Sequence, residues 1–130
     1  MTEYKFRVPY LPVSVNKMYS YNFGTRTKYL SKEASHFKSA LKIACPPMKF
    51  EVAQPKLDIF IAYHSPKFLC KNGRYRKMDG PNMDKLIIDA ICERIGYDDS
   101  LIFIWSGIKV IDQDEFTEVV VKEIGGQDVI

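Results

Sequence analysis

The chain has 130 residues, of which 46% are hydrophobic and 27% are charged, as is usual for one soluble globular domain, here residues 1–130. Its formal net charge of +3 is too small to indicate a nucleic-acid or membrane partner by itself. No apolar run approaches the roughly 20 residues of a membrane span, and the N-terminus lacks the apolar core of a secretory signal. The cysteines, Cys45, Cys70 and Cys92, form no CxxC motif, so we predict neither a disulfide framework nor a zinc site, and a cytoplasmic location.

The first half of the chain predicts a strand, a loop and a helix. Apolar and polar residues alternate over residues 5–10, the period of a half-buried strand. A polar, aromatic-rich segment then reads as a loop through Arg26. Ser31 is suited to cap a helix that Pro46 and Pro47 end. A further short strand is possible at residues 48–52.

The second half predicts a strand, a helix and two more strands. Apolar residues alternate with others over residues 56–64, a strand pattern that places Leu57, Ile59, Ile61 and Tyr63 on one face. The second helix is expected to begin at Pro81, capped by Asp79 or Gly80, and to end at Gly96. Residues 101–111 and 115–124 then read as a hairpin that turns near residues 112–114. This order predicts a two-layer α+β domain, a mixed sheet with two main helices packed on one face.

The second helix brings chemically useful residues together. Asn82, Lys85 and Asp89 stand at i, i+3 and i+7 and so share one helix face, with Asp79 at the helix entrance. Asp98 and Asp99 follow in the turn before the next strand. Carboxylates converging from separate elements hold Mg²⁺, and a nearby lysine stabilises charge on a phosphate. The same residues also describe a helix cap followed by a solvated acidic turn, and both interpretations stay open.

Two stretches are basic and interleaved with aromatic residues, a pattern that indicates phosphate contacts or simply two solvated loops. The candidate DNA-binding residues are Lys17, Arg26, Lys28, Lys71, Arg74, Arg76 and Lys77. No GxSxG, GxGxxG or P-loop motif is present, so acyl transfer and a nucleotide cofactor are not expected. His36 and His64 have no partner at metal-ligand spacing.

Over most of its length the sequence resembles the RusA family of Holliday-junction resolvases. That family's pattern is an acidic residue, a spacer, a second acidic residue directly before an asparagine, and a lysine three positions later. A helix, a glycine and an acidic pair before a strand complete it. The matching positions here are Asp79, Asn82, Lys85, Asp89 to Ile91, Gly96, Asp98 and Asp99, with "LPVSVNKMY" and "GTRTKYLSKEASHF" matching the family's earlier segments.

The resemblance implies a RusA-like fold and a homodimeric, metal-dependent endodeoxyribonuclease, a hydrolase that cleaves branched DNA in recombination and repair. It implies that Asp79 and Asp99 bind Mg²⁺ or Mn²⁺, that Asp98 or Asp89 is an auxiliary ligand, and that Lys85 and Asn82 belong to the catalytic site.

One position departs from the family pattern, because Pro81 replaces the second acidic residue and brings no ligand oxygen. Asp84 is not expected to substitute for it, since it lies about 200° round the helix from Asn82. A cleavage-deficient protein that binds structured DNA is therefore the alternative function. A compact α+β interaction protein is a third.

Overall fold

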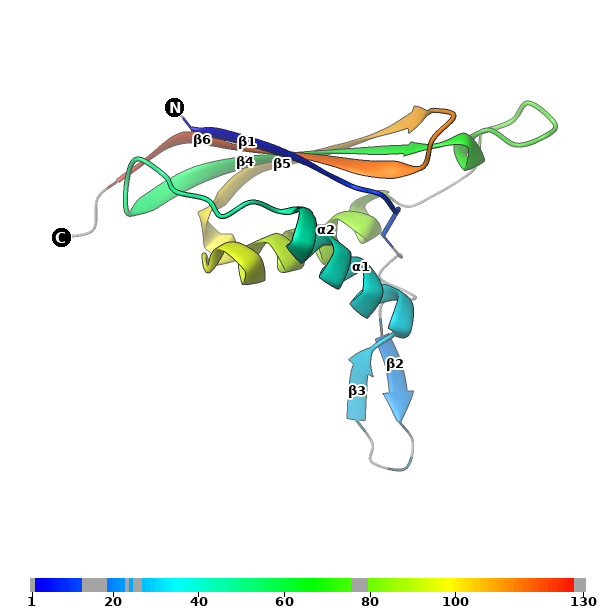
Figure 1. Ribbon diagram of the computed structural model, residues 1–130, viewed down its shortest axis with the longest axis horizontal. Helices are drawn as coiled ribbons and strands as arrows, with labels where there is room; N and C mark the ends of the chain where they lie inside the picture. Colours follow the sequence, from blue (N-terminus) through cyan, green and yellow to red (C-terminus); the bar gives the residue numbers. More distant parts are fainter. Residues whose placement is uncertain (1, 13–18, 23, 25–26, 76–79, 128–130) are drawn as a thin grey trace.

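The computed structural model describes residues 2–12, 19–22, 24, 27–75 and 80–127, which form one mixed sheet, two helices and a small β-ribbon (Figure 1). The elements in chain order are β1 (Glu3–Val8), β2 (Tyr19–Asn22), β3 (Thr27–Leu30), α1 (Lys32–Ala44), β4 (Gln54–Ser65), the 3₁₀ turn η2 (Pro66–Phe68), α2 (Gly80–Ile95), the 3₁₀ turn η3 (Asp99–Leu101), β5 (Ile102–Ile111) and β6 (Phe116–Gln127).

The four-stranded sheet has the order β1-β6-β4-β5. The β4–β5 pair is parallel, whereas β6 is antiparallel to both β1 and β4. Both helices lie on the same side of this sheet (Figure 1). The predicted α+β class, with a mixed sheet and two main helices on one face, is confirmed.

The predicted hairpin between the last two strands is wrong, because β4 lies between them. Tyr63 of β4 is paired with Lys109 of β5 on one side and with Thr117 of β6 on the other. The connection between β5 and β6 instead passes the end of β4, where Ser65 Oγ donates to Glu115 at 3.0 Å. Sequence patterns predicted the four strands of this sheet, but they carry no information about which strands are neighbours.

The core lies between the helices and one face of the sheet. The face of β4 that carries Leu57 is buried, and so is the apolar stripe of α2. These core residues are Leu57, Ile59, Ile61 and Tyr63 of β4 and Met83, Leu86, Ile87, Ala90 and Ile91 of α2. Helix α1 adds Phe37 and Leu41. Their burial supplies the hydrophobic driving force that holds the helices against the sheet.

The helix ends follow the local signals in the sequence. Ser31 caps α1, and its Oγ accepts a hydrogen bond from the Ala34 amide at 3.2 Å. Gly96 follows α2 with φ +77°, a conformation that glycine adopts without strain. Helix α2 begins at Gly80, so Gly80 is its first residue instead of its cap, and Pro81 is its second.

Two local expectations about the first half need correction. The segment predicted as a loop through Arg26 contains β2, which forms an antiparallel ribbon with β3 that projects away from the sheet (Figure 1). Residues 48–52 form no strand; there the chain packs through Met48, and the Glu51 amide donates to the Glu123 carboxylate at 3.0 Å. In the described part of the chain, neither helix has the length and apolar character needed to cross a membrane.

Candidate functional site

A groove of about 660 Å³ runs between α2 and β5. Its walls include Asp84, Lys85 and Asp89 from α2, and Trp105 and Lys109 from β5. Asp99, in the turn before β5, closes it at the end where α2 stops. The groove therefore collects three residues that the sequence associated with the site, Lys85, Asp89 and Asp99.

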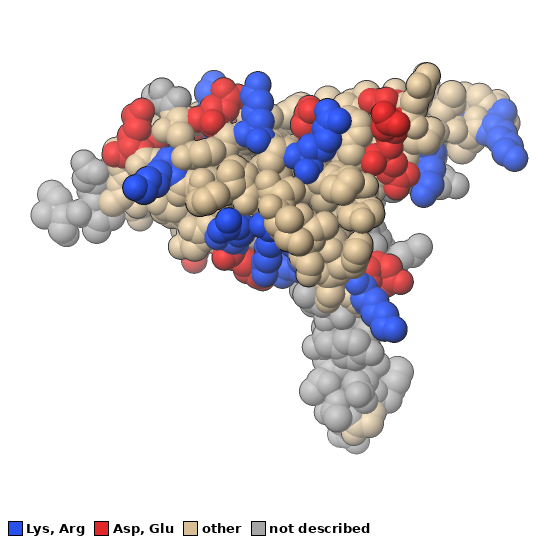
Figure 2. All heavy atoms as spheres, in the orientation of Figure 1, with Lys and Arg blue, Asp and Glu red and all other residues tan. Residues whose placement is uncertain are grey.

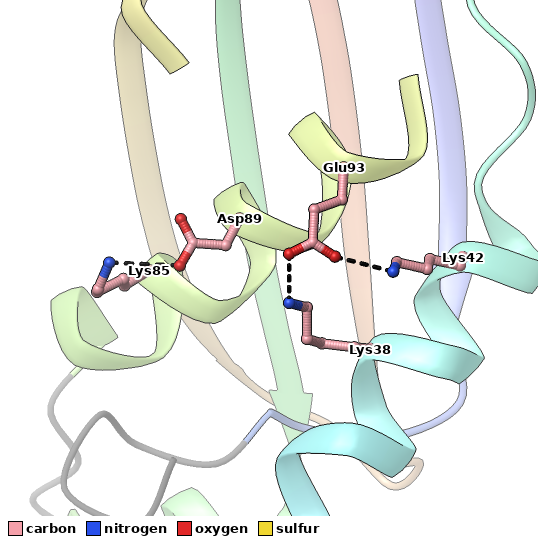
Figure 3. Close-up of polar contacts among 5 residues, drawn as sticks. All are labelled: Lys38, Lys42, Lys85, Asp89 and Glu93. Atoms are coloured by element: carbon pink, nitrogen blue, oxygen red, sulfur yellow. Dashed lines mark hydrogen bonds and ion pairs between the residues drawn. The ribbon is translucent and has the colours of Figure 1, made fainter. Parts of the chain in front are cut away.

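Lys85 and Asp89 form one side of the groove. Lys85 Nζ lies 3.3 Å from Asp89 Oδ2, an i, i+4 ion pair on the face of α2 that the helical spacing predicted (Figure 3). The pair is partly exposed, so its energetic value is small, but it holds the ammonium group at the groove. Asn82 is in the first turn of the same helix.

The acidic pair has two different local roles. The Asp98 side chain caps η3 by accepting from the Ser100 amide at 2.8 Å, and this hydrogen bond lowers the pKa of the exposed carboxyl. Asp99 instead lines the main groove, and together with Asp89 it also lines a neighbouring hollow of about 370 Å³ that contains Cys92. Burial, followed by repulsion from Asp99 and Asp89, raises the pKa of the Cys92 thiol to about 11.

Asp84 forms the floor of the groove. Only 9% of this residue is exposed, and its carboxylate accepts a hydrogen bond from the Tyr63 hydroxyl of β4. Burial raises the pKa of Asp84, while the hydrogen bond from Tyr63 opposes that shift. Burial and the same hydrogen bond both raise the pKa of Tyr63.

The sequence predicts that Asp84 does not substitute for the missing carboxylate, and this stays a prediction. The structure adds that Asp84 lines the groove from the side of α2 that faces β5. There Gly107 lacks a side chain, and a Cβ at that position would lie 3.2 Å from Asp84 Oδ1. The groove therefore extends beneath the helix to the Asp84 carboxylate.

The donor chemistry of the groove suits Mg²⁺, which takes one or two carboxylates and completes its shell with water or substrate phosphate. Among the described residues, no three Asp, Glu, His or Cys side chains lie close enough together to hold one ion. Asp79, the first predicted ligand, lies outside the described residues. Asp89 and Asp99, which border both hollows, are the described carboxylates best placed to supply one or two ligands.

The predicted DNA-binding residues are only partly described. Lys17, Arg26, Arg76 and Lys77 lie outside the described residues, and Lys28 belongs to β3. Lys71 and Arg74 are exposed in the loop that extends beyond η2, which a Leu69–Tyr75 bridge closes (Figure 1). Figure 2 shows positive and negative side chains interspersed over the described part of the face in view. The charge segregation along the sequence is therefore not evident on this face.

Sequence reasoning missed four groove residues: Asp84, Tyr63, Trp105 and Lys109. Trp105 is 60% exposed although it belongs to a strand. The available signal was "WSGIK", in which a glycine separates an aromatic residue from a lysine on a strand. A scan against protein-family models finds no match for this chain, and a search of curated proteins finds no significant relative.

Proposed function

We propose that this protein is a metal-dependent endodeoxyribonuclease that cleaves branched DNA, as its resemblance to the RusA resolvases implies. The observation that carries the proposal is the shared groove: Lys85 and Asp99, two elements of the family pattern, come from different segments and line one cavity. An ordinary helix cap followed by a solvated turn does not require these residues to face a common space.

In this proposal the groove binds the scissile phosphate. Lys85 contributes positive charge to the phosphate oxygens, and the Asp89 carboxylate orients its ammonium group. Asp99 and Asp79 hold Mg²⁺ or Mn²⁺, with Asp89 as the auxiliary ligand in preference to Asp98, whose oxygen already caps η3. When bound, the metal activates water and neutralises phosphate charge. Asn82 in the first turn of α2 completes the catalytic set.

The proposed partners are branched DNA and a second copy of this chain, in the cytoplasm. A four-way junction is two-fold symmetric, so two related cuts require two active sites. Among the described strands, β5 pairs only with β4, and its Ile104 and Ile108 are about half exposed. Antiparallel pairing of two β5 edges would cover these side chains. We expect Ile108→Glu to convert a dimer into a monomer in analytical ultracentrifugation.

A second candidate function is junction binding without cleavage. It is favoured by Pro81, which has no ligand oxygen where the family pattern has its second acid. The described carboxylates do not form a three-ligand cluster that would replace it.

One cleavage experiment separates the two functions. A synthetic four-way junction and a linear duplex are incubated with the parent protein and its Asp79→Asn, Asp99→Asn and Pro81→Asp variants, with and without Mg²⁺. Asp114→Asn, an exposed carboxylate in the β5–β6 connection, is the matched control. Metal-dependent paired nicks in the junction, lost in Asp79→Asn and Asp99→Asn only, support the nuclease. If the parent protein binds the junction without nicking it, and Pro81→Asp does nick it, the result supports the alternative. Absence of junction binding contradicts both functions.

A further inference from the structure

The wall of the groove contains an exposed indole. Trp105 is the only tryptophan in the chain, and 60% of it is accessible although it belongs to a strand. It is paired with the buried Ile59 of β4, so it is on the sheet face that the helices cover. Trp105 thus stands beside α2 with an open aromatic surface. Exposed tryptophan is costly in water, and tryptophan is enriched at surfaces that bind a partner or ligand.

The floor beside this indole is polar and fixed in place. Asp84, nine-tenths buried, presents its carboxylate to the groove while the Tyr63 hydroxyl hydrogen-bonds it. Two strand positions beyond Trp105, Gly107 packs closely against this carboxylate, and any side chain there would crowd it. A buried carboxylate without a cationic partner is unfavourable. A ligand with N–H donors would compensate it.

The rim of the groove carries cations. Lys85 projects from α2, and Lys109 follows Gly107 on β5, where its Nζ lies 5.8 Å from the centre of the Phe68 ring. An aromatic platform, a fixed hydrogen-bond acceptor and flanking ammonium groups match the three parts of a nucleotide. These are the base face, the base edge and the phosphate.

We propose that the groove binds one unpaired nucleobase, which stacks on Trp105 while its amino-bearing edge donates to Asp84. This inference rests on the proposed function for the identity of the ligand as DNA. A base inside a duplex has its faces stacked and its Watson–Crick edge paired, so only an unpaired base fills the site. Adenine, cytosine and guanine offer exocyclic amino groups, whereas thymine offers one N–H between two carbonyl oxygens that repel a carboxylate. The groove therefore selects unpaired, amino-bearing bases at a branch point.

The single tryptophan provides a direct test that does not require cleavage. Intrinsic fluorescence is measured in EDTA while oligo-dC, oligo-dA, oligo-dT or a fully paired duplex is added, and fluorescence anisotropy of labelled DNA reports binding independently. We expect oligo-dC and oligo-dA to quench Trp105 more strongly than oligo-dT, and duplex to leave its emission unchanged. Trp105→Ala should weaken single-strand binding about fivefold or more, the value of stacking one base.

Two variants make the test specific. Phe103→Ala removes an aromatic residue of similar exposure, 56%, from the same strand but outside the groove, and should alter single-strand binding less than about twofold. Asp84→Asn keeps an acceptor for Tyr63 but adds an amide donor, so it should abolish the preference for oligo-dC over oligo-dT without abolishing binding.

Three outcomes would overturn the inference. One is single-strand binding with no change in Trp105 emission, and another is equal quenching by duplex and single strands. The third is a change of oligomeric state in Trp105→Ala, which would make the indole an interface residue. If the protein cuts junctions yet shows any of these outcomes, the base-binding proposal is refuted and the proposed nuclease function is not. A protein that binds unpaired bases but never cuts refutes only the nuclease.

Discussion

Glu93 links the two helices, and its removal should expose the cost of a nearly buried lysine. Its carboxylate accepts from Lys38 at 2.6 Å and from Lys42 at 2.8 Å, two lysines one turn apart on α1 (Figure 3). The Lys38 side chain is only 11% exposed, against 42% for Lys42 and 48% for Glu93. The two ion pairs therefore share one acceptor but differ in how far their cations are removed from water.

The expected magnitudes follow from that difference. Breaking a fully buried pair costs about 3–5 kcal/mol, and an exposed pair is worth about 0.2–1 kcal/mol. Because water reaches Glu93, we expect Glu93→Ala to lower the free energy of unfolding by about 2 kcal/mol at pH 7. Glu93→Gln keeps a neutral hydrogen bond and should cost about 1 kcal/mol. Lys42→Ala, the matched control, should cost about 0.5 kcal/mol or less.

The pH dependence of these variants gives a second readout. Hydrogen bonds from Lys38 and then Lys42 lower the pKa of Glu93 below its ordinary 4.5. The stabilisation is therefore complete above pH 4.5 and is lost as the pH falls through the lower folded-state pKa. Urea unfolding followed by circular dichroism at pH 7 and pH 3 would measure it. A Lys42→Ala cost equal to that of Glu93→Ala, or the same Glu93→Gln cost at both pH values, would refute this reasoning.

Three further predictions concern stability. Ser31→Ala should lower the free energy of unfolding by about 1 kcal/mol, because the Ala34 amide loses its cap; urea unfolding would measure this. Gly126→Ala should cost at least about 2 kcal/mol more than Gly125→Ala in the same assay, because only at residue 126 does a Cβ lie 2.6 Å from the Gln54 carbonyl oxygen. Tyr63→Phe should destabilise the protein near neutral pH and less at acidic pH, where protonated Asp84 no longer needs the donor. Thermal melts that give the same cost at both pH values would contradict this.

The elements of this fold were largely predictable from the sequence because their signals are local. The period-two pattern of β4, the Ser31 cap and the Gly96 stop each act within a few residues, and the structure confirms each. The ribbon of β2 and β3 was missed. Strand partners were missed as well, since the insertion of β6 beside β4 depends on contacts between distant segments.

Three residues that line the groove were predicted from the sequence, Lys85 and Asp89 on α2 and Asp99 in the turn before β5. The helical repeat placed Lys85 and Asp89 on one face, and their ion pair confirms this. The same repeat does not reveal the environment of Asp84, because a helical wheel describes one helix and not the strand that it faces. The absent side chain at Gly107 determines that environment, and only the packing of β5 against α2 reveals it.

The strand order has a consequence for how the chain folds as it is synthesised. Strands β1 and β4 are not neighbours, and β6, which is synthesised after both, fills the space between them. A nascent chain that ends before Phe116 therefore lacks the two ladders that join β1 to the rest of the sheet. Such long-range pairing forms slowly, and unpaired edges expose the intermediate to aggregation. The sheet can be completed only after translation of β6, and until then a chaperone that covers strand edges would protect it.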